Sequence, residues 1–407
     1  MSLTTTMRGE VSDMAPELVE LRHDLHRYPE VGLHLPRTQE TLLEALGDLG
    51  LELSLGKDLS SVTGVLRGSK TGRSVLLRAD MDALPVQERT GVDFGSEVDG
   101  VMHACGHDLH VAMLVGGARL LSAHRDSLQG DVVFMFQPGE EGWDGAATMI
   151  EEGVLSAAGP TVEAAYGMHV QSATTPNNVF TTRQGTLMAS SSRLIVTVLG
   201  RGGHGSTPHL GRDPVTAAAE MITSLQAMVT RRFDVFDPVV ITVGMIHGGT
   251  ASNVIPDTVE FRATIRTFSP QAHALVGDLA VKVCQGVATA HGLEVEATHL
   301  PEYPATVNDP HHADFVAAVA RDVFGEDRYQ PMVSPLTGSE DFSRVLASVP
   351  GSYMMLGASL AADVTTAPSN HSPRAMFDDT VIPTGALLHA ELALRSLARP
   401  TTTPVAP

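Results

Sequence analysis

Cysteine, aromatic residues and basic charge are all scarce in this 407-residue chain. Only two cysteines are present, which excludes a disulfide framework. Lys and Arg total 27 against 47 Asp and Glu, and the resulting net charge of -20 argues against a nucleic-acid partner, because phosphate binding needs clustered basic side chains. The sequence also lacks an apolar run of about 20 residues and a basic-then-apolar start. We therefore expect a cytoplasmic protein without a membrane partner.

The length of the chain predicts two domains, because 407 residues exceed the size at which one hydrophobic core usually stops growing. A content of 43% hydrophobic and 18% charged residues is typical of a folded globular protein. Short apolar segments alternate with helical patterns near both ends of the chain, as in an α/β fold. The first helix is expected from about Ser12 to Tyr28, with Pro16 in its first turn.

The order of elements changes between about Gln184 and Leu300. There the pattern predicts strand, helix, strand, strand, helix and strand, which is the ferredoxin-like order. We therefore expect an open mixed-sheet α/β catalytic domain, with helices on both faces, that is interrupted by an inserted ferredoxin-like α+β domain. The expected bounds are 1–185 and 300–407 for the two parts of the catalytic domain and 186–299 for the insertion.

The motif with the clearest chemistry contains Cys105 and His107, which offer a thiolate and an imidazole at Cys-x-His spacing. Glu140 and Glu141 follow the apolar segment Asp131–Phe136. One of these carboxylates can bind a metal ion while the other transfers protons. Alone, each motif has an ordinary explanation, a buried free thiol or a solvated acidic loop. Together they predict a hydrolytic metal site.

Two further histidines strengthen the prediction, since His169 and His371 also lie just after short apolar segments. Residues at the carboxyl ends of strands can converge in one crevice of an open α/β sheet. Five candidate ligands exceed the needs of one tetrahedral ion, so we expect two divalent ions about 3.5 to 4 Å apart. Thiolate, imidazole and carboxylate together suit zinc, although manganese, cobalt and nickel are alternatives.

Three other positions are ambiguous from the residues alone. Asp82 shares one face of a strand end with Asp80, and we interpret it as a carboxylate that orients a ligand histidine, with a surface turn as the alternative. His204 lies in a glycine-rich loop that lacks the ending of a phosphate-binding loop and that alone indicates a hairpin turn. Asn253 has the ordinary explanation of a turn asparagine.

The motifs taken together resemble the amidohydrolase branch of the dinuclear metal aminoacylase and carboxypeptidase family. That branch contains N-acyl-amino-acid amidohydrolases, hippurate hydrolases and auxin-conjugate hydrolases. The resemblance extends over nearly the whole chain. Its segments are Leu21–His26, Arg78–Pro85, His103–Asp108, Phe136–Gly142, Gly203–Gly205, Pro208–His209, Gly248–Pro256 and Gly338–Phe342.

This resemblance assigns roles to single residues. It implies that the metal ligands are Cys105, His107, Glu141, His169 and His371, and that Glu140 is the general base and acid. It also implies a homodimer, with a tetramer as the alternative, in which the inserted domain dimerises and supplies His204 to the partner's active site. Asn253 and Arg266 match positions that contact a small-molecule N-acyl amino acid, with Arg266 placed to hold its carboxylate.

The expected activity is metal-dependent hydrolysis of N-acyl amino acids, hippurate-like or with other aromatic acyl groups, to a carboxylic acid and a free amino acid. Two alternatives stay open. One is a dipeptidase or N-carbamoyl-amino-acid hydrolase on the same scaffold, and the other is a catalytically silent metal-binding homologue. The pair Glu140 and Glu141 is intact, which argues against the silent homologue.

Overall fold

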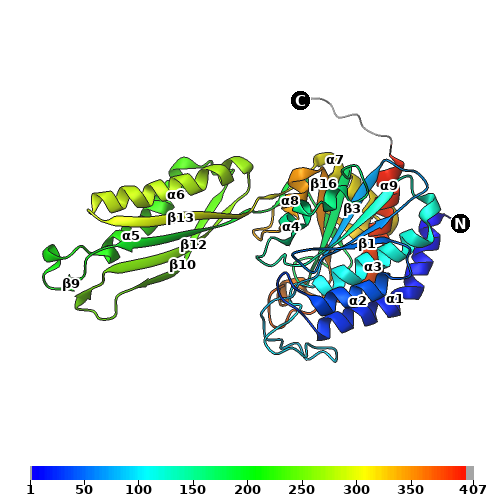
Figure 1. Ribbon diagram of the computed structural model, residues 1–407, viewed down its shortest axis with the longest axis horizontal. Helices are drawn as coiled ribbons and strands as arrows, with labels where there is room; N and C mark the ends of the chain where they lie inside the picture. The colour runs from blue at the N-terminus through cyan, green and yellow to red at the C-terminus, as the bar shows by residue number, and fades with distance from the viewer. Residues whose placement is uncertain (1, 400–407) are drawn as a thin grey trace. The chain divides into compact units, whose positions relative to one another are not determined.

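The computed structural model describes residues 2–399, which separate into two compact units (Figure 1). Unit 1 contains residues 2–187, 307–334 and 344–399, and unit 2 contains residues 188–306 and 335–343. Unit 2 is therefore an insertion in the sequence of unit 1. The last residues of the expected second catalytic segment, 400–407, lie outside the described part of the chain.

A mixed eight-stranded sheet forms the centre of unit 1. Its strands are β1 (Glu52–Leu55), β2 (Val62–Leu66), β3 (Ser74–Asp80), β4 (Asp131–Gln137), β5 (Ala164–Gln171), β6 (Phe180–Thr182), β15 (Tyr329–Pro331) and β16 (Gly351–Gly357), in the order β1-β2-β4-β3-β5-β16-β6-β15. Strand β3 pairs in parallel with β4 and β5, and β5 pairs in parallel with β16. Every residue of β3, β4 and β16 is buried, as expected for strands covered on both faces.

The helices of unit 1 cover both faces of this sheet. They are α1 (Leu3–Arg27), α2 (Pro36–Leu46), α3 (His107–Ala123), α4 (Gly145–Glu151), α7 (Pro310–Phe324), α8 (Ser343–Ser348) and α9 (Val381–Ala398). Figure 1 shows α3 and α9 on one side of the sheet and α4 and α8 on the other. This confirms the predicted α/β class. Within residues 2–399, none of the helices is long and apolar enough to cross a membrane.

Helix α1 begins at Leu3, so the predicted start at Ser12 is wrong. The Ser2 side chain accepts a hydrogen bond from the Thr5 backbone N–H and caps the helix. Met7 and Val11 are buried and extend the apolar stripe of the helix by two turns toward its N-terminus. Tertiary burial thus sets the start of this helix, and Pro16 lies inside it rather than in its first turn.

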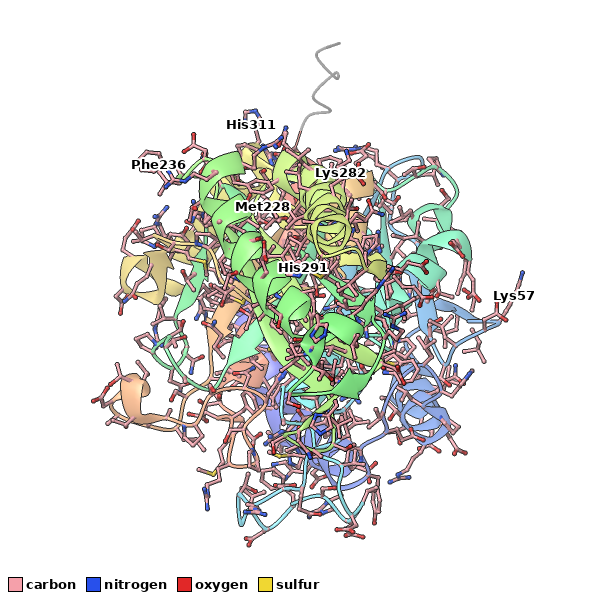
Figure 2. All side chains as sticks on the ribbon, turned by 90° about the vertical axis from the view of Figure 1, so that its left-hand side faces the viewer. Lys57, Met228, Phe236, Lys282, His291 and His311 are labelled. Carbon is pink, nitrogen blue, oxygen red and sulfur yellow. The ribbon has the colours of Figure 1, made fainter. Side chains whose placement is uncertain are left out.

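Unit 2 has the predicted ferredoxin-like architecture. Its elements are β8 (Ser191–Leu199), α5 (Pro214–Arg232), β10 (Val239–Gly248), β12 (Thr258–Thr267), α6 (Pro270–Ala290) and β13 (Glu294–Tyr303). The sheet has the order β10-β12-β8-β13, and all of its pairs are antiparallel. Figure 2 shows α5 and α6 side by side, carrying Met228 and Lys282, respectively. His291, just after α6, contacts Glu220 of α5 at 2.7 Å.

The two helices cover one face of the unit 2 sheet. Alternate strand residues such as Val196 and Phe261 are fully buried in a core shared with Met221. Residues of the opposite alternation, such as Val240 and Ile246, are exposed. This period-two pattern explains why the strands of unit 2 are recognisable from the sequence.

Candidate metal centre

The predicted ligands of unit 1 come together near the carboxyl ends of the strands of its sheet. Cys105 lies two residues before α3 and His107 begins it, Glu141 follows β4, His169 lies near the end of β5, and His371 lies in a loop beyond β16. Strand ends and the N-terminus of a helix therefore supply the cluster. This is where ligands bind in open α/β sheets.

Cys105 lies at the centre of the cluster. Its Sγ is 3.3 Å from Nε2 of His169 and 3.3 Å from Nε2 of His371. Possible ligand atoms of Cys105, His107 and His169 lie within 4.8 Å of one another, and so do those of Cys105, Glu141 and His371. One thiolate thus belongs to two groups of three donors. Together the two groups would offer donors for two neighbouring divalent ions.

Main-chain carbonyls orient two of the imidazoles. Nδ1 of His107 is 2.8 Å from the Asp82 carbonyl oxygen, and Nδ1 of His169 is 2.7 Å from that of Val170. A carbonyl only accepts, so each Nδ1 carries the hydrogen and each Nε2 presents a lone pair. Nε2 of His107 is buried and has no hydrogen-bond partner among the described residues. The donor set of thiolate, imidazoles and carboxylate therefore fits zinc-like divalent ions.

Ionisation within the cluster is strongly coupled. Burial raises the pKa of the Cys105 thiol, and the Glu141 charge adds to this effect. Contacts with Cys105 and Glu141 raise the pKa of His371 to about 10. Burial also opposes ionisation of Glu141, but its interactions with His371, His107 and Cys105 together outweigh burial and lower the pKa of the carboxyl group. A divalent cation bound here must compete with protons, so metal affinity should rise with pH.

Two backbone conformations support the ligand geometry. Gly106, between two predicted ligands, has a φ of 86°, and a Cβ added there would lie 2.5 Å from a methyl carbon of Val170. Only glycine fits this left-handed and crowded position. His371 itself has a φ of 68°, which is costly for a non-glycine residue and recurs at functional sites. This conformation accompanies the approach of its side chain to Cys105 and Glu141.

Glu140 and Glu141 lie in a tight turn after β4. The Asp82 carboxylate accepts hydrogen bonds from both of their backbone N–H groups, at 2.9 and 3.0 Å. The turn brings both glutamates to one cluster, and possible ligand atoms of Glu140, Glu141 and His107 lie within 4.8 Å of one another. Asp82 thus contacts His107 through its main-chain oxygen, while its carboxylate holds the turn and lies 3.6 Å from His107 Nδ1.

His204 and Asn253 lie side by side in unit 2. A short ribbon pairs β9 (Gly203–His204) with β11 (Val254–Ile255), and Gly205 donates its N–H to the Asn253 carbonyl at 2.8 Å. The Ser206 backbone N–H donates to Nδ1 of His204 at 3.1 Å. Nε2 of His204 therefore carries the hydrogen. An exposed imidazole in this state can donate a hydrogen bond to a carbonyl oxygen.

Arg266 lies near the other end of the unit 2 sheet. Strand β12 begins at Thr258, close to the ribbon of His204, and eight residues of extended chain to Arg266 cover about 26 Å. The half-buried guanidinium donates to Ser191 Oγ at 2.8 Å, and burial lowers its pKa. Within one chain, Arg266 is thus too far from His204 and Asn253 to bind the same small molecule.

Sequence reasoning missed the role of Asn370. Its Nδ2 donates to the Cys105 carbonyl at 3.1 Å and to the Val170 carbonyl at 3.0 Å. Its Oδ1 accepts from the Ser172 N–H at 3.0 Å. One amide thus joins the segments of three predicted ligands, and its position next to His371 is the signal that could have indicated it.

Residues 76–395 match the model for peptidase family M20/M25/M40. The chain belongs to this family. Thermostable carboxypeptidase 1 of Saccharolobus solfataricus is 37% identical over 97% of this chain and 99% of its own length. The IAA-amino acid hydrolase ILR1-like 4 of Arabidopsis thaliana is 38% identical, with 97% and 88% covered. Hippurate hydrolase of Campylobacter jejuni is 33% identical, with 95% and 98% covered.

Solved structures agree with this family membership. A Staphylococcus aureus protein described as an aminohydrolase matches with a TM-score of 0.90 and 29% identity, covering 97% of this chain and 100% of its own. A dinuclear metal-binding M20 peptidase of Bacillus subtilis matches with a TM-score of 0.81 and 31% identity, covering 95% and 99%. The predictions of an enzyme and of the family that the sequence resembles are confirmed. This M20/M25/M40 protein is an amidohydrolase.

Proposed function

We propose that this M20/M25/M40 protein hydrolyses N-acyl amino acids to a carboxylic acid and a free amino acid. The observation that carries the proposal is the cluster of two three-donor groups that share Cys105, with Glu140 in the adjoining turn. Relatives named as hippurate hydrolase and IAA-amino acid hydrolase support this substrate class.

Two divalent ions would be held by Cys105, His107, Glu141, His169 and His371, and the ions could be zinc, manganese, cobalt or nickel. Bound there, they would lower the pKa of water and polarise the substrate carbonyl. The Bacillus subtilis M20 peptidase, which is described as dinuclear metal-binding, supports the proposal of two metal ions.

Glu140 is the proton carrier in this proposal. The Glu141 carboxylate lies 3.1 Å from His371 and is in one group of possible ligands with Cys105 and His371. We therefore assign Glu141 as a metal ligand. Glu140 lies in the same turn, is only 6% exposed, and has its backbone fixed by Asp82. It takes a proton from the attacking water and returns it to the leaving amine nitrogen. Asp82 keeps the turn in place for both steps.

The substrate residues of unit 2 support a homodimer. His204 and Asn253 lie at one end of the unit 2 sheet and Arg266 near the other, so no single chain brings all three to one small molecule. In the proposed dimer, the partner's His204 polarises the scissile carbonyl, Asn253 contacts the substrate and Arg266 holds the substrate carboxylate. Strand β10, at one edge of the sheet with Val240 and Ile246 exposed, offers a surface for this association. The tetramer and the cytoplasmic location stay predictions.

A substrate panel tests the proposed activity. The chelated protein is reloaded with Zn²⁺, Mn²⁺ or Co²⁺ and assayed side by side on hippurate, N-acetyl amino acids, dipeptides and N-carbamoyl amino acids. We expect turnover of the first two classes to be lost on chelation and restored by metal. Faster cleavage of dipeptides would favour the alternative suggested by the relatives named carboxypeptidases. No metal-dependent turnover of any amide would contradict the proposal.

A further inference from the structure

His110 is a buried histidine that the reaction above does not use. It lies in α3 one turn after His107 and is 1% exposed. Its ring centroid is 5.3 Å from that of His107 and 4.8 Å from that of His169. A polar ring placed between two metal-binding imidazoles must have both of its nitrogens satisfied or pay a desolvation penalty.

Hydrogen bonds on both sides of the ring fix its tautomer. The Val170 backbone N–H donates to Nε2 of His110 at 2.9 Å, so Nε2 carries no hydrogen. Nδ1 therefore carries it and donates to Oδ1 of Asp80 at 2.5 Å. Neither nitrogen keeps a lone pair for a metal ion. Although His110, Asp80 and His107 are close enough together to suggest a metal site, His110 is not a ligand.

The Asp80 carboxylate, which His110 holds on one side, lies beside His107 without a hydrogen bond to it. Its Oδ2 contacts the Arg78 guanidinium at 2.5 Å and lies 3.5 Å from Nε2 of His107. Asp80, Arg78 and His107 are at most 1% exposed. Charge-assisted hydrogen bonds are strong in such surroundings, and the carboxylate cannot turn away without leaving a buried charge unpaired.

The Val170 peptide continues the network toward His169. Its N–H is held by His110, and its carbonyl accepts the Nδ1 hydrogen of His169. One peptide plane therefore connects the two rings. If His110 releases the N–H, the carbonyl that sets the His169 tautomer is free to tilt.

We infer that His110 is a positioning residue, which holds the Val170 peptide that sets the His169 tautomer and keeps the Asp80 carboxylate in place beside Nε2 of His107. The inference rests on the proposed metal centre. Partners that orient metal ligands typically contribute 10- to 100-fold to metal affinity, which sets the size of the expected effect.

Two substitutions at His110 each remove one of its two hydrogen bonds and keep the other. In His110→Asn the amide lies near the position of Nδ1 and can still donate to Asp80, but it loses the Val170 contact. In His110→Gln the amide oxygen lies near the position of Nε2 and can still accept from Val170, but the Asp80 contact is lost. The control is His389→Gln, a buried histidine of α9 that packs beside Gly117 of α3 and whose Nδ1 has no hydrogen-bond partner among the described residues.

Metal affinity is measured with Co²⁺ in competition with a chromophoric chelator, and the visible spectrum of the Co²⁺ protein reports the coordination geometry. We expect both His110 variants to bind Co²⁺ about 10- to 100-fold more weakly than the wild type and to show altered spectra, with the control unchanged. A purely structural role would lower the unfolding midpoint of the metal-free protein and leave Co²⁺ affinity as it is.

The outcomes separate this inference from the proposed function. A wild-type protein that binds no pair of Co²⁺ ions would refute the metal centre itself. A wild type that binds the pair, with both His110 variants as tight as His389→Gln, would refute only the positioning role. Should the variants not fold, ¹⁵N-histidine NMR of the wild type still decides. We expect hydrogen on Nδ1 of His110 and none on Nε2, and the opposite tautomer would overturn the inference.

Discussion

Glu140 and Glu141 are neighbours in the sequence, but their contacts differ, and substitution separates their roles. We expect Glu140→Gln to keep its metal ions and to lose about 10²- to 10⁴-fold in kcat, the usual contribution of a positioned acid-base group. Glu141→Gln should instead lose metal, because the amide replaces a charged oxygen that lies 3.1 Å from His371. Elemental analysis and steady-state kinetics on both variants check this. The reverse pattern would exchange the two roles.

His389 gives the protein a defined sensitivity to acid. Burial lowers the pKa of its imidazole to about 3, from 6.5 in the unfolded chain. Between these values the unfolded chain binds more protons than the folded one, so stability is full above pH 6.5 and falls as the pH is lowered toward 3. From pH 6.5 to pH 5 this single group accounts for about 2 kcal/mol.

The substitution His389→Gln isolates this effect. Between pH 7 and pH 5, the free energy of unfolding of the metal-free variant should fall by about 2 kcal/mol less than that of the wild type. Urea unfolding of both proteins at the two pH values measures the difference. An equal fall in both proteins would show that His389 can take up a proton in the folded state.

Residues of the site were predictable from the sequence only where a side chain of metal-binding type also lies near the end of a predicted strand. Cys105 and His107 stand out by residue type and spacing. His110 and Asn370 do not, because a buried histidine and a loop asparagine have common structural roles. Their contacts with Val170 depend on β5 lying against α3 and the loop of His371. Such tertiary contacts leave no local pattern in a single sequence.

At the level of elements, the turn after β4 depends on the segment that follows β3. The Asp82 carboxylate accepts both N–H groups of the turn, whereas an asparagine there offers only one oxygen and an alanine none. We therefore expect kcat to decrease from wild type to Asp82→Asn to Asp82→Ala, with about 10- to 100-fold weaker metal binding in the alanine variant. Kinetics and metal titration of the three proteins check the order. Equal losses in both variants would mean that the carboxylate does not hold the turn.

The elements of unit 2 were predictable because each strand alternates between a buried and an exposed face, and both helices carry one apolar stripe. The start of α1 was not predictable from the sequence. Its first residues include three threonines and Gly9, which are weak helix formers, so local propensity gives no helix there. Burial of Met7 and Val11 against the rest of unit 1 supplies the missing stabilisation.

At the scale of the whole molecule, the proposal that two subunits share each active site rests on the spacing of residues in unit 2. Arg266 lies about 26 Å along β12 from Thr258, the end of the strand that is close to the ribbon of His204. A single small substrate cannot bridge that distance. A second copy of the chain can supply the missing histidine, and a symmetric dimer would then complete both sites at once.

A complementation experiment tests this arrangement. His204→Ala should bind metal normally and turn over slowly, because it lacks only the donor to the scissile carbonyl. Glu140→Gln should also be slow, because it lacks the carboxylate that transfers protons. After subunit exchange, each hybrid dimer contains one site with an intact Glu140 and a partner-supplied His204. Random mixing of equal amounts should therefore restore about one quarter of the wild-type sites.

The matched control mixes Glu140→Gln with Cys105→Ser. Both of these defects lie in the metal centre of a single chain, so every site of their hybrid keeps one defect and no activity should return. The proportion of hybrid dimers is measured by native mass spectrometry of differently tagged subunits. If hybrids form and the His204→Ala mixture stays as slow as its parents, His204 acts within its own chain. Arg266 would then be the wrong residue for the substrate carboxylate, because the two side chains cannot reach one small molecule from the same unit 2.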